Sequence, residues 1–375
     1  MTALQEGRLP NRPATAGRRF FGGSATAAPE GTIEIDAGCG KVERSERFFL
    51  GVVRATFALA VGFAAGATAS AQPGPRGPGA SAPVRWGNES DSGPSYVRTE
   101  GSGVIDENAV RTAREIDSHS TGTPEWTNPK GFEKDVFTFA RAVFKAGPTT
   151  ANSPWMHRGR SIGWWVDFPD ADLNLSYRLQ QITSIRADPD GRVMRLNESD
   201  LNHYPFLFMS HPGYMQLREA EIANLRKYLL AGGTLVIIDF WNSVEWAGFE
   251  AQMKKVLPER SWTNLEMDHP LFHCVYDLKG PMQSLQVPTM QFWNRARNPN
   301  DPTAPLQIDR GPDSEKMTVR ALHDDRGHIM VIAFHNSDIS DGWEREAEHA
   351  DYFATFSEKI SYPLGVNLIF YLMSH

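Results

Sequence analysis

The sequence predicts an α/β domain with a mostly parallel central sheet, and residues 206–240 predict it most clearly. Two short apolar runs, 206–209 and 234–238, are typical of strands that are buried on both faces. Apolar residues recur at helical spacing over 222–229 between them, and Gly232-Gly233 ends that helix. Two buried strands joined by a helix require a parallel, right-handed crossover.

The rest of the folded unit, expected to be a single domain over 131–375, continues this alternation of strands and helices. Further strands are expected at 137–144, 161–166, 193–196, 317–322 and 328–334, of which the last two form a hairpin around Gly327. Further helices are expected at 172–182, capped by Asp172, and at 246–257 and 362–373. Residues 280–312 are rich in Pro and Asn and irregular, and loops of this length are usually covers or insertions.

The first 71 residues predict an N-terminal extension followed by a secretory signal peptide. Arginines flank an apolar stretch over 48–65, and Ala69-Ser70-Ala71 follows as a small-residue cleavage pattern before Gln72. A membrane anchor is the alternative, but the apolar stretch is short and rich in Gly and Ala. Signal peptides begin near the initiator methionine, whereas this stretch lies far from Met1, so we expect translation to start downstream of Met1. We therefore expect an exported protein, periplasmic or extracellular.

Residues 72–130 predict a flexible linker, because Pro, Gly, Ser and Asn dominate and apolar residues are sparse. Cys39 precedes the predicted signal, so Cys274 would be alone in the mature chain and no internal disulfide is expected. The net charge of −7 provides no basic stripe for nucleic acid. No second apolar stretch is long enough to span a membrane after signal cleavage.

Polar side chains follow the predicted strands where those strands end. His211 follows the first buried strand, Asp239 ends the second, and His335, Asn336 and Asp338 end or follow a third. Because the carboxyl ends of parallel strands meet at one edge, where ligands bind, we expect these groups to converge. Imidazole and carboxylates suit a divalent metal or general acid–base catalysis, which makes all of these except Asn336 catalytic candidates. Capping of helices and bonding of loops is the alternative.

The sequence offers further candidates for ligand binding. Asp167 and Asp170 belong to a dense acidic turn, although the turn lacks the Gly and Glu of an EF-hand. The rings of Trp241 and Trp343 could stack on a sugar, with packing in the core as the alternative, and Asn336 completes the set. A loop that contains Asp268, His269 and His273 could bind zinc, but its spacing is not diagnostic. The sequence requires no cofactor.

Several segments in order make the chain from about residue 137 to 375 resemble the bacterial domain-of-unknown-function family 4159. They are 165–175, 204–207, 225–229 with Gly232-Gly233, 268–272, 335–338 and 362–368. The resemblance implies a flavodoxin-like α/β sandwich similar to the class I glutamine amidotransferase-like superfamily, and it implies little about activity. Amidotransferases use a Cys on a tight elbow between strand and helix. No such elbow follows either buried strand, and Cys274 lacks flanking glycines, so amidotransferase activity is not expected.

These observations leave two hypotheses of function open. The first is a non-catalytic module of the cell envelope that binds a small molecule, such as a carbohydrate, or an envelope protein. The second is a metal-assisted or His/Asp-based hydrolase or isomerase that acts on a sugar or related metabolite. The fold cannot choose between them, because one fold hosts many functions.

Overall fold

The computed structural model describes residues 96–98, 104–132, 135–146, 163–296 and 312–375. These belong to the second of two units of the chain, Arg85–His375. The predicted signal peptide and the first part of the predicted linker lie outside the described residues. The predicted α/β class with a mostly parallel sheet is confirmed.

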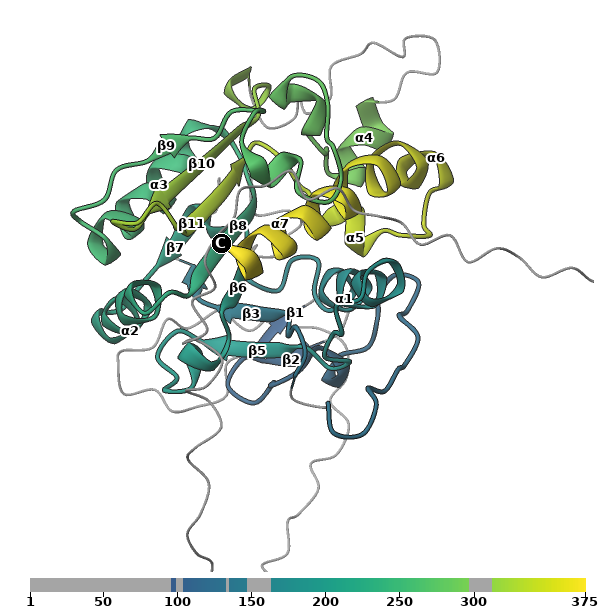
Figure 1. The fold of residues 1–375 in the computed structure, drawn as a ribbon, viewed down its shortest axis with the longest axis horizontal. Helices are drawn as coiled ribbons and strands as arrows, with labels where there is room; N and C mark the ends of the chain where they lie inside the picture. Colours follow the sequence, from purple (N-terminus) through teal and green to yellow (C-terminus); the bar gives the residue numbers. More distant parts are fainter. Residues whose placement is uncertain (1–95, 99–103, 133–134, 147–162, 297–311) are drawn as a thin grey trace, which may run out of the picture. The chain divides into compact units, whose positions relative to one another are not determined.

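A seven-stranded sheet with the order β5-β3-β6-β8-β11-β10-β9 forms the centre of this unit (Figure 1). Its strands along the chain are β3 (Ala140–Val143), β5 (Arg192–Arg195), β6 (Phe206–Ser210), β8 (Thr234–Phe240), β9 (Thr263–Asn264), β10 (Thr318–His323) and β11 (Ile329–His335). The first five strands in the sheet order are parallel, and β10 and β9 extend it as antiparallel strands. Two short pairs stand apart: β1 (Tyr96–Arg98) with β2 (Val104–Asp106), and β4 (Lys145–Ala146) with β7 (Met215–Gln216).

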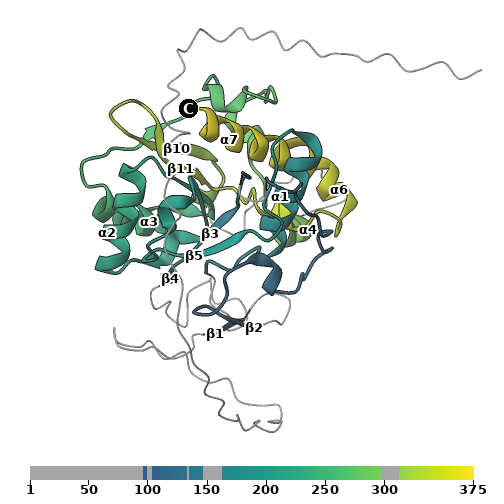
Figure 2. The ribbon, with the colours of Figure 1, turned by 60° about the horizontal axis from the view of Figure 1, so that its bottom comes forward.

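Helices cover both faces of the sheet. They are α1 (Asp170–Ile182), α2 (Glu219–Leu230), α3 (Asn242–Val256), α4 (Met290–Ala296), α5 (Asp341–Glu344), α6 (Ala350–Tyr352), a π-helix (Phe353–Ser361) and α7 (Tyr362–Ser374). Helices α2 and α3 lie on one face, and α1 and α7 lie on the other (Figures 1 and 2). Within the described ranges, no helix combines the length and the apolar character needed to cross a membrane.

Strand β6 shows why the sequence forms this sandwich. Leu207 and Met209 pack in the core under α2 and α3, whereas Phe206 and Phe208 pack in the core under α1 and α7. All four side chains are buried, because both faces of the strand are covered. A strand in this position needs an uninterrupted apolar run, and that is the pattern that predicted it.

Most predicted elements are confirmed, and the strand expected at 161–166 is the clearest error. Its described part, from Gly163, is a series of turns. The carbonyls of Trp164 and Val166 accept hydrogen bonds from the Arg141 guanidinium instead of a neighbouring strand, at 2.9 and 2.8 Å. Residues 280–312, expected to be irregular, include α4 and a 3₁₀ turn, Met282–Leu285.

The predicted linker also differs from the structure in its described part, residues 96–98 and 104–130. Arg114 donates hydrogen bonds to the carbonyls of Pro189, Thr123 and Pro124 at 2.8–3.0 Å. The indole of Trp126 donates to the carbonyl of Ala187 at 3.1 Å. Polar bonds to backbone attach part of this segment, and Ile105, Val110 and Ala113 attach it further by burial in the hydrophobic core. These apolar residues are too few and too widely spaced to give a clear hydrophobic pattern in the sequence.

Candidate functional site

Three carboxylates from separate segments meet at the carboxyl edge of the parallel strands. Asp167 precedes α1, Asp239 lies near the end of β8, and Asp338 follows β11. One oxygen of each lies within 4.8 Å of an oxygen of the other two, and each residue is at most 2% exposed. We call these three residues the carboxylate centre.

His211 lies directly beside the centre. Its Nδ1 is 3.0 Å from Oδ2 of Asp239, and the indole Nε1 of Trp241 donates to Oδ1 of Asp239 at 2.7 Å. A carboxylate only accepts hydrogen bonds, so Nδ1 carries the proton of this contact. A carboxylate that fixes the tautomer of a histidine in this way prepares it for acid–base chemistry.

Ser340 links the other two carboxylates. Its Oγ lies 2.6 Å from Oδ2 of Asp167 and 3.2 Å from Oδ1 of Asp338. Asp338 also accepts hydrogen bonds from the Asp341 N–H and the Thr289 hydroxyl, at 3.0 and 3.1 Å. A hydroxyl has one proton and can donate to one carboxylate at a time. A proton on a carboxyl group or a cation beside it would stabilise the second close contact.

The raised pKa values of two of these carboxylates also indicate that the centre needs a positive charge. Burial raises the pKa of Asp167 well above its usual value, and the negative charges of Asp239 and Asp341 raise it further. Burial likewise raises the pKa of Asp338, with added repulsion from Asp239, Asp167 and Asp341. Three carboxylates in this position need a positive charge, either shared protons or a bound cation.

A second carboxylate group borders the centre and is neutralised differently. Oxygens of Asp341 and Glu344 lie within 4.8 Å of Asp167 and of each other. The Nε of Arg345 lies 3.2 Å from Oδ1 of Asp341 and 2.6 Å from Oε2 of Glu344. Neither carboxylate is among the candidates expected from the sequence, although their three-residue spacing after Asp338 is a signal that could have found them.

The backbone is strained at the centre. Among the described residues, five non-glycine residues have positive φ, and Asp167, His211 and Asp239 are three of them, with φ of 63°, 58° and 54°. The left-handed conformation costs about 1–2 kcal/mol for a residue with a Cβ. Strain of this kind clusters at functional sites, where the surroundings hold it in place.

The other two positive-φ residues, Asn242 and Asn336, explain where two of the sequence candidates lie. Asn336 accepts a hydrogen bond from the N–H of Asn242 at 2.7 Å, and Nε2 of His335 lies 2.9 Å from the carbonyl of Asn242. The His335 ring packs between Phe240 and Trp246, at 5.0 and 5.3 Å between centroids. Both side chains hold the turn that begins α3, and the contacts described for them are separate from the carboxylate centre.

The remaining candidates divide between the site and the core. Asp170 accepts a hydrogen bond from the backbone N–H of His119 at 3.0 Å, so the segment before the domain reaches α1. The predicted capping of α1 by Asp172 is wrong, because that carboxylate binds the Arg141 guanidinium. Trp343 packs on Phe208 in the core and donates to the Ser361 carbonyl.

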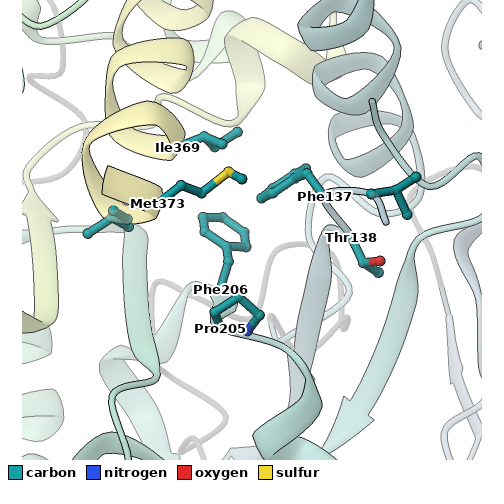
Figure 3. A pocket seen from close by; sticks show the side chains of 8 residues that line it. Phe137, Thr138, Pro205, Phe206, Ile369 and Met373 are labelled. Carbon is teal, nitrogen blue, oxygen red and sulfur yellow. The ribbon is translucent and has the colours of Figure 1, made fainter. Parts of the chain in front are cut away.

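A small apolar hollow of about 90 Å³ lies at the opposite, amino edge of the sheet. Phe137 and Phe206 enter it from the strand side, and Ile369 and Met373 enter it from α7 (Figure 3).

In the loop proposed for zinc, Nδ1 of His273 lies 2.7 Å from Asp277, and Nδ1 of His269 accepts from the Leu271 N–H. Both histidines therefore stabilise their own loop.

His335 makes the stability of the fold depend on pH. Burial lowers its pKa to about 4, so the unfolded chain, with a pKa near 6.5, binds the proton more strongly. The stability that neutral His335 contributes is complete above pH 6.5 and is lost as the pH falls toward 4. The loss is about 3 kcal/mol, because each unit of difference in pKa corresponds to about 1.4 kcal/mol. Urea unfolding at pH 7 and pH 4.5 should show a larger loss for the wild type than for His335→Gln. Equal losses would contradict this role.

Comparison with known proteins gives the chain a family. No curated protein matches it. A family model described as a domain of unknown function matches residues 157–373, which is more than half of the chain and includes all three residues of the carboxylate centre. The chain therefore belongs to the family Domain of unknown function (DUF4159).

Proposed function

We propose that Asp167, Asp239 and Asp338 bind one hard divalent cation and that the protein is a metal-assisted hydrolase or isomerase. Its substrate would be a sugar or a related small metabolite. The observation that carries this proposal is the meeting of three buried carboxylates within 4.8 Å. The positive charge of Arg345 balances the negative charges of Asp341 and Glu344. The groups that hydrogen-bond to Asp338 carry no charge, so they leave its negative charge to be balanced by a cation.

The ligand atoms favour a hard cation. All three are carboxylate oxygens, the type of ligand that Ca²⁺, Mg²⁺ and Mn²⁺ prefer. Oxygens on opposite sides of a Ca²⁺ ion are roughly 5 Å apart, because each metal–oxygen bond is about 2.3–2.6 Å. The spacing in the centre fits within this limit. A cation would also offset the burial and the mutual repulsion that raise the pKa values of Asp167 and Asp338.

His211 supports catalysis rather than binding alone. Asp239 would serve both as a cation ligand and as the group that orients His211, so acid–base chemistry and the cation would act at one place. The left-handed backbone at Asp167, His211 and Asp239 supports a functional role for these residues.

One observation favours the second candidate, a non-catalytic binding module of the cell envelope. The carboxylate centre is almost fully buried, with exposures of 1–2%. A cation so enclosed could stabilise the fold while a ligand or an envelope protein binds elsewhere.

A terbium titration of the chain from Gln72 onward tests the proposal. Tb³⁺ takes the same oxygen ligands as Ca²⁺, and the indole of Trp241, bonded to Asp239, would sensitise its luminescence. We expect a saturable signal at one site per chain that Ca²⁺, Mg²⁺ or Mn²⁺ displaces. The absence of any such signal would contradict the cation centre.

His211→Gln separates the two candidate functions. An enzyme should keep its cation and lose turnover of sugars and related small metabolites in this variant, whereas a binding module should show no turnover even as the wild type. A panel of metals, a chelator, sugars and cell-wall fragments should also be screened by thermal shift, since a ligand that binds the folded state raises the midpoint of its thermal unfolding.

We also propose a flavodoxin-like fold and export from the cytoplasm. Numbered along the chain, the five parallel strands have the order 2-1-3-4-5, which supports the flavodoxin-like fold. The apolar stretch at 48–65 and the Ala69-Ser70-Ala71 pattern support export. N-terminal sequencing of the secreted chain would test cleavage before Gln72.

A further inference from the structure

We propose that residues 117–124 form a lid over the carboxylate centre and that this lid must open before a hydrated divalent cation can enter. This inference rests on the cation centre proposed above. We call residues 117–124 the strap. They precede the residues that the family model matches and were expected to be a flexible linker.

His119 brings the strap onto two carboxylates that lie beside the centre, Glu344 and Asp170. Its Nε2 lies 3.2 Å from Oε1 of Glu344, and its Nδ1 lies 3.5 Å from Oδ2 of Asp170. Glu344 has an oxygen within 4.8 Å of Asp167, so a short series of contacts joins the strap to the centre. The side chain of His119 is only 6% exposed and therefore covers these carboxylates.

Polar bonds hold the strap in place. Its Ser118 hydroxyl bonds Asp170, and its Thr123 hydroxyl bonds Asn174 in α1. Arg114, just before the strap, donates to the carbonyls of Thr123 and Pro124 at 2.8 Å. Within residues 117–124, all of which the structure describes, Thr123 is the one residue that is buried as a whole, and the side chain of His119 is buried as well. No apolar side chain of the strap is anchored in a core.

Residues 287–293 cover another side of the centre, and this segment is attached much more firmly than the strap. Thr289 bonds Asp338, and its neighbours Val287 and Met290 are buried in the core. Trp293 packs against Tyr352 at 5.5 Å between ring centroids. A segment with few buried apolar contacts opens at lower free energy than one anchored in a core. The strap is therefore the cover that opens more easily.

Arg114→Ala tests the lid without touching the centre. Loss of its bonds to the strap should raise the open fraction, so both the association and the dissociation rate of Tb³⁺ should rise about tenfold. The dissociation constant should stay within about twofold, because a gate changes both rates equally. Stopped-flow luminescence with Tb³⁺ measures the rates, and equilibrium titration measures the constant.

Two further variants complete this experiment. Thr123→Val removes the hydroxyl bond to Asn174 at nearly constant volume and should accelerate both rates in the same direction. Arg226→Ala is the matched control, because Arg226 donates to the Val256 carbonyl between α2 and α3, so neither rate should change.

The possible results separate the lid from the centre. Terbium binding with unchanged rates in Arg114→Ala and Thr123→Val would overturn the lid and leave the cation centre in place. A changed dissociation constant with an unchanged association rate would also overturn the lid. A wild type that binds no Tb³⁺ would overturn the centre and the lid with it.

Discussion

Replacing Arg141 with Met should lower the free energy of unfolding by about 3–5 kcal/mol, because it breaks a buried ion pair. Arg141 is fully buried, and its Nε lies 2.9 and 3.0 Å from the two carboxylate oxygens of Asp172. Methionine fills much of the same volume but leaves the Asp172 carboxylate buried without its cation. Urea unfolding of the two proteins at pH 7 measures the loss.

The same substitution should weaken the carboxylate centre. The guanidinium donates to the carbonyls of Trp164 and Val166, in the turn that places Asp167. Groups that orient metal ligands typically change metal affinity by about 10- to 100-fold, and we expect a loss in this range. The terbium titration described above measures it.

The double variant Arg141→Met with Asp172→Leu is the control. It removes both charges, so much of the lost stability should return, since neutral replacements of buried ion pairs are often tolerated. Its cation affinity should stay low, because the bonds to the turn before Asp167 are still missing. A double variant no more stable than Arg141→Met would contradict the role assigned to this pair.

Asp338→Asn should have opposite effects on stability and on cation binding. Asn can still accept from the Asp341 N–H and can donate to the Thr289 hydroxyl, so the local geometry should persist. Cation affinity should fall by at least about 100-fold with the loss of a charged ligand. In a chelator the variant should be more stable than the wild type, by about 1–4 kcal/mol, because one buried charge is removed.

The difference in stability between the wild type and Asp338→Asn should depend on pH with a defined sign. Because the pKa of Asp338 is raised in the folded state, the wild type loses stability as the pH rises from about 4 through that raised value. The difference between wild type and Asp338→Asn in chelator should therefore be small near pH 4 and largest at neutral pH. Asp325→Asn, on the exposed β10–β11 turn, should show neither effect. A destabilised Asp338→Asn at neutral pH in chelator would contradict the account.

The central layers could be predicted from the sequence because their signals are local. The run 206–209 and the apolar face of α2 specify burial by themselves. The strand expected at 161–166 failed for a non-local reason. Its two tryptophans are buried from a turn, and a guanidinium from β3 binds the carbonyls that a neighbouring strand would have paired.

The candidate site was predictable where side chains follow the ends of parallel strands. His211, Asp239 and Asp338 were expected at one edge, and the structure brings them together. The sequence did not group Asp167 with them, because its position depends on the buried bonds of Arg141. The sequence also could not show that His335 points toward the carbonyl of Asn242, because this contact depends on the left-handed backbone at Asn242 and Asn336.

Equilibrium dialysis against Ca²⁺ and Mn²⁺, followed by elemental analysis, tests the cation centre most directly. The wild type should retain about one cation per chain, and Asp338→Asn should retain none at the same free concentration. Asp325→Asn should behave as the wild type. A wild type that retains no cation, or an Asp338→Asn variant that retains as much as the wild type, would contradict the account.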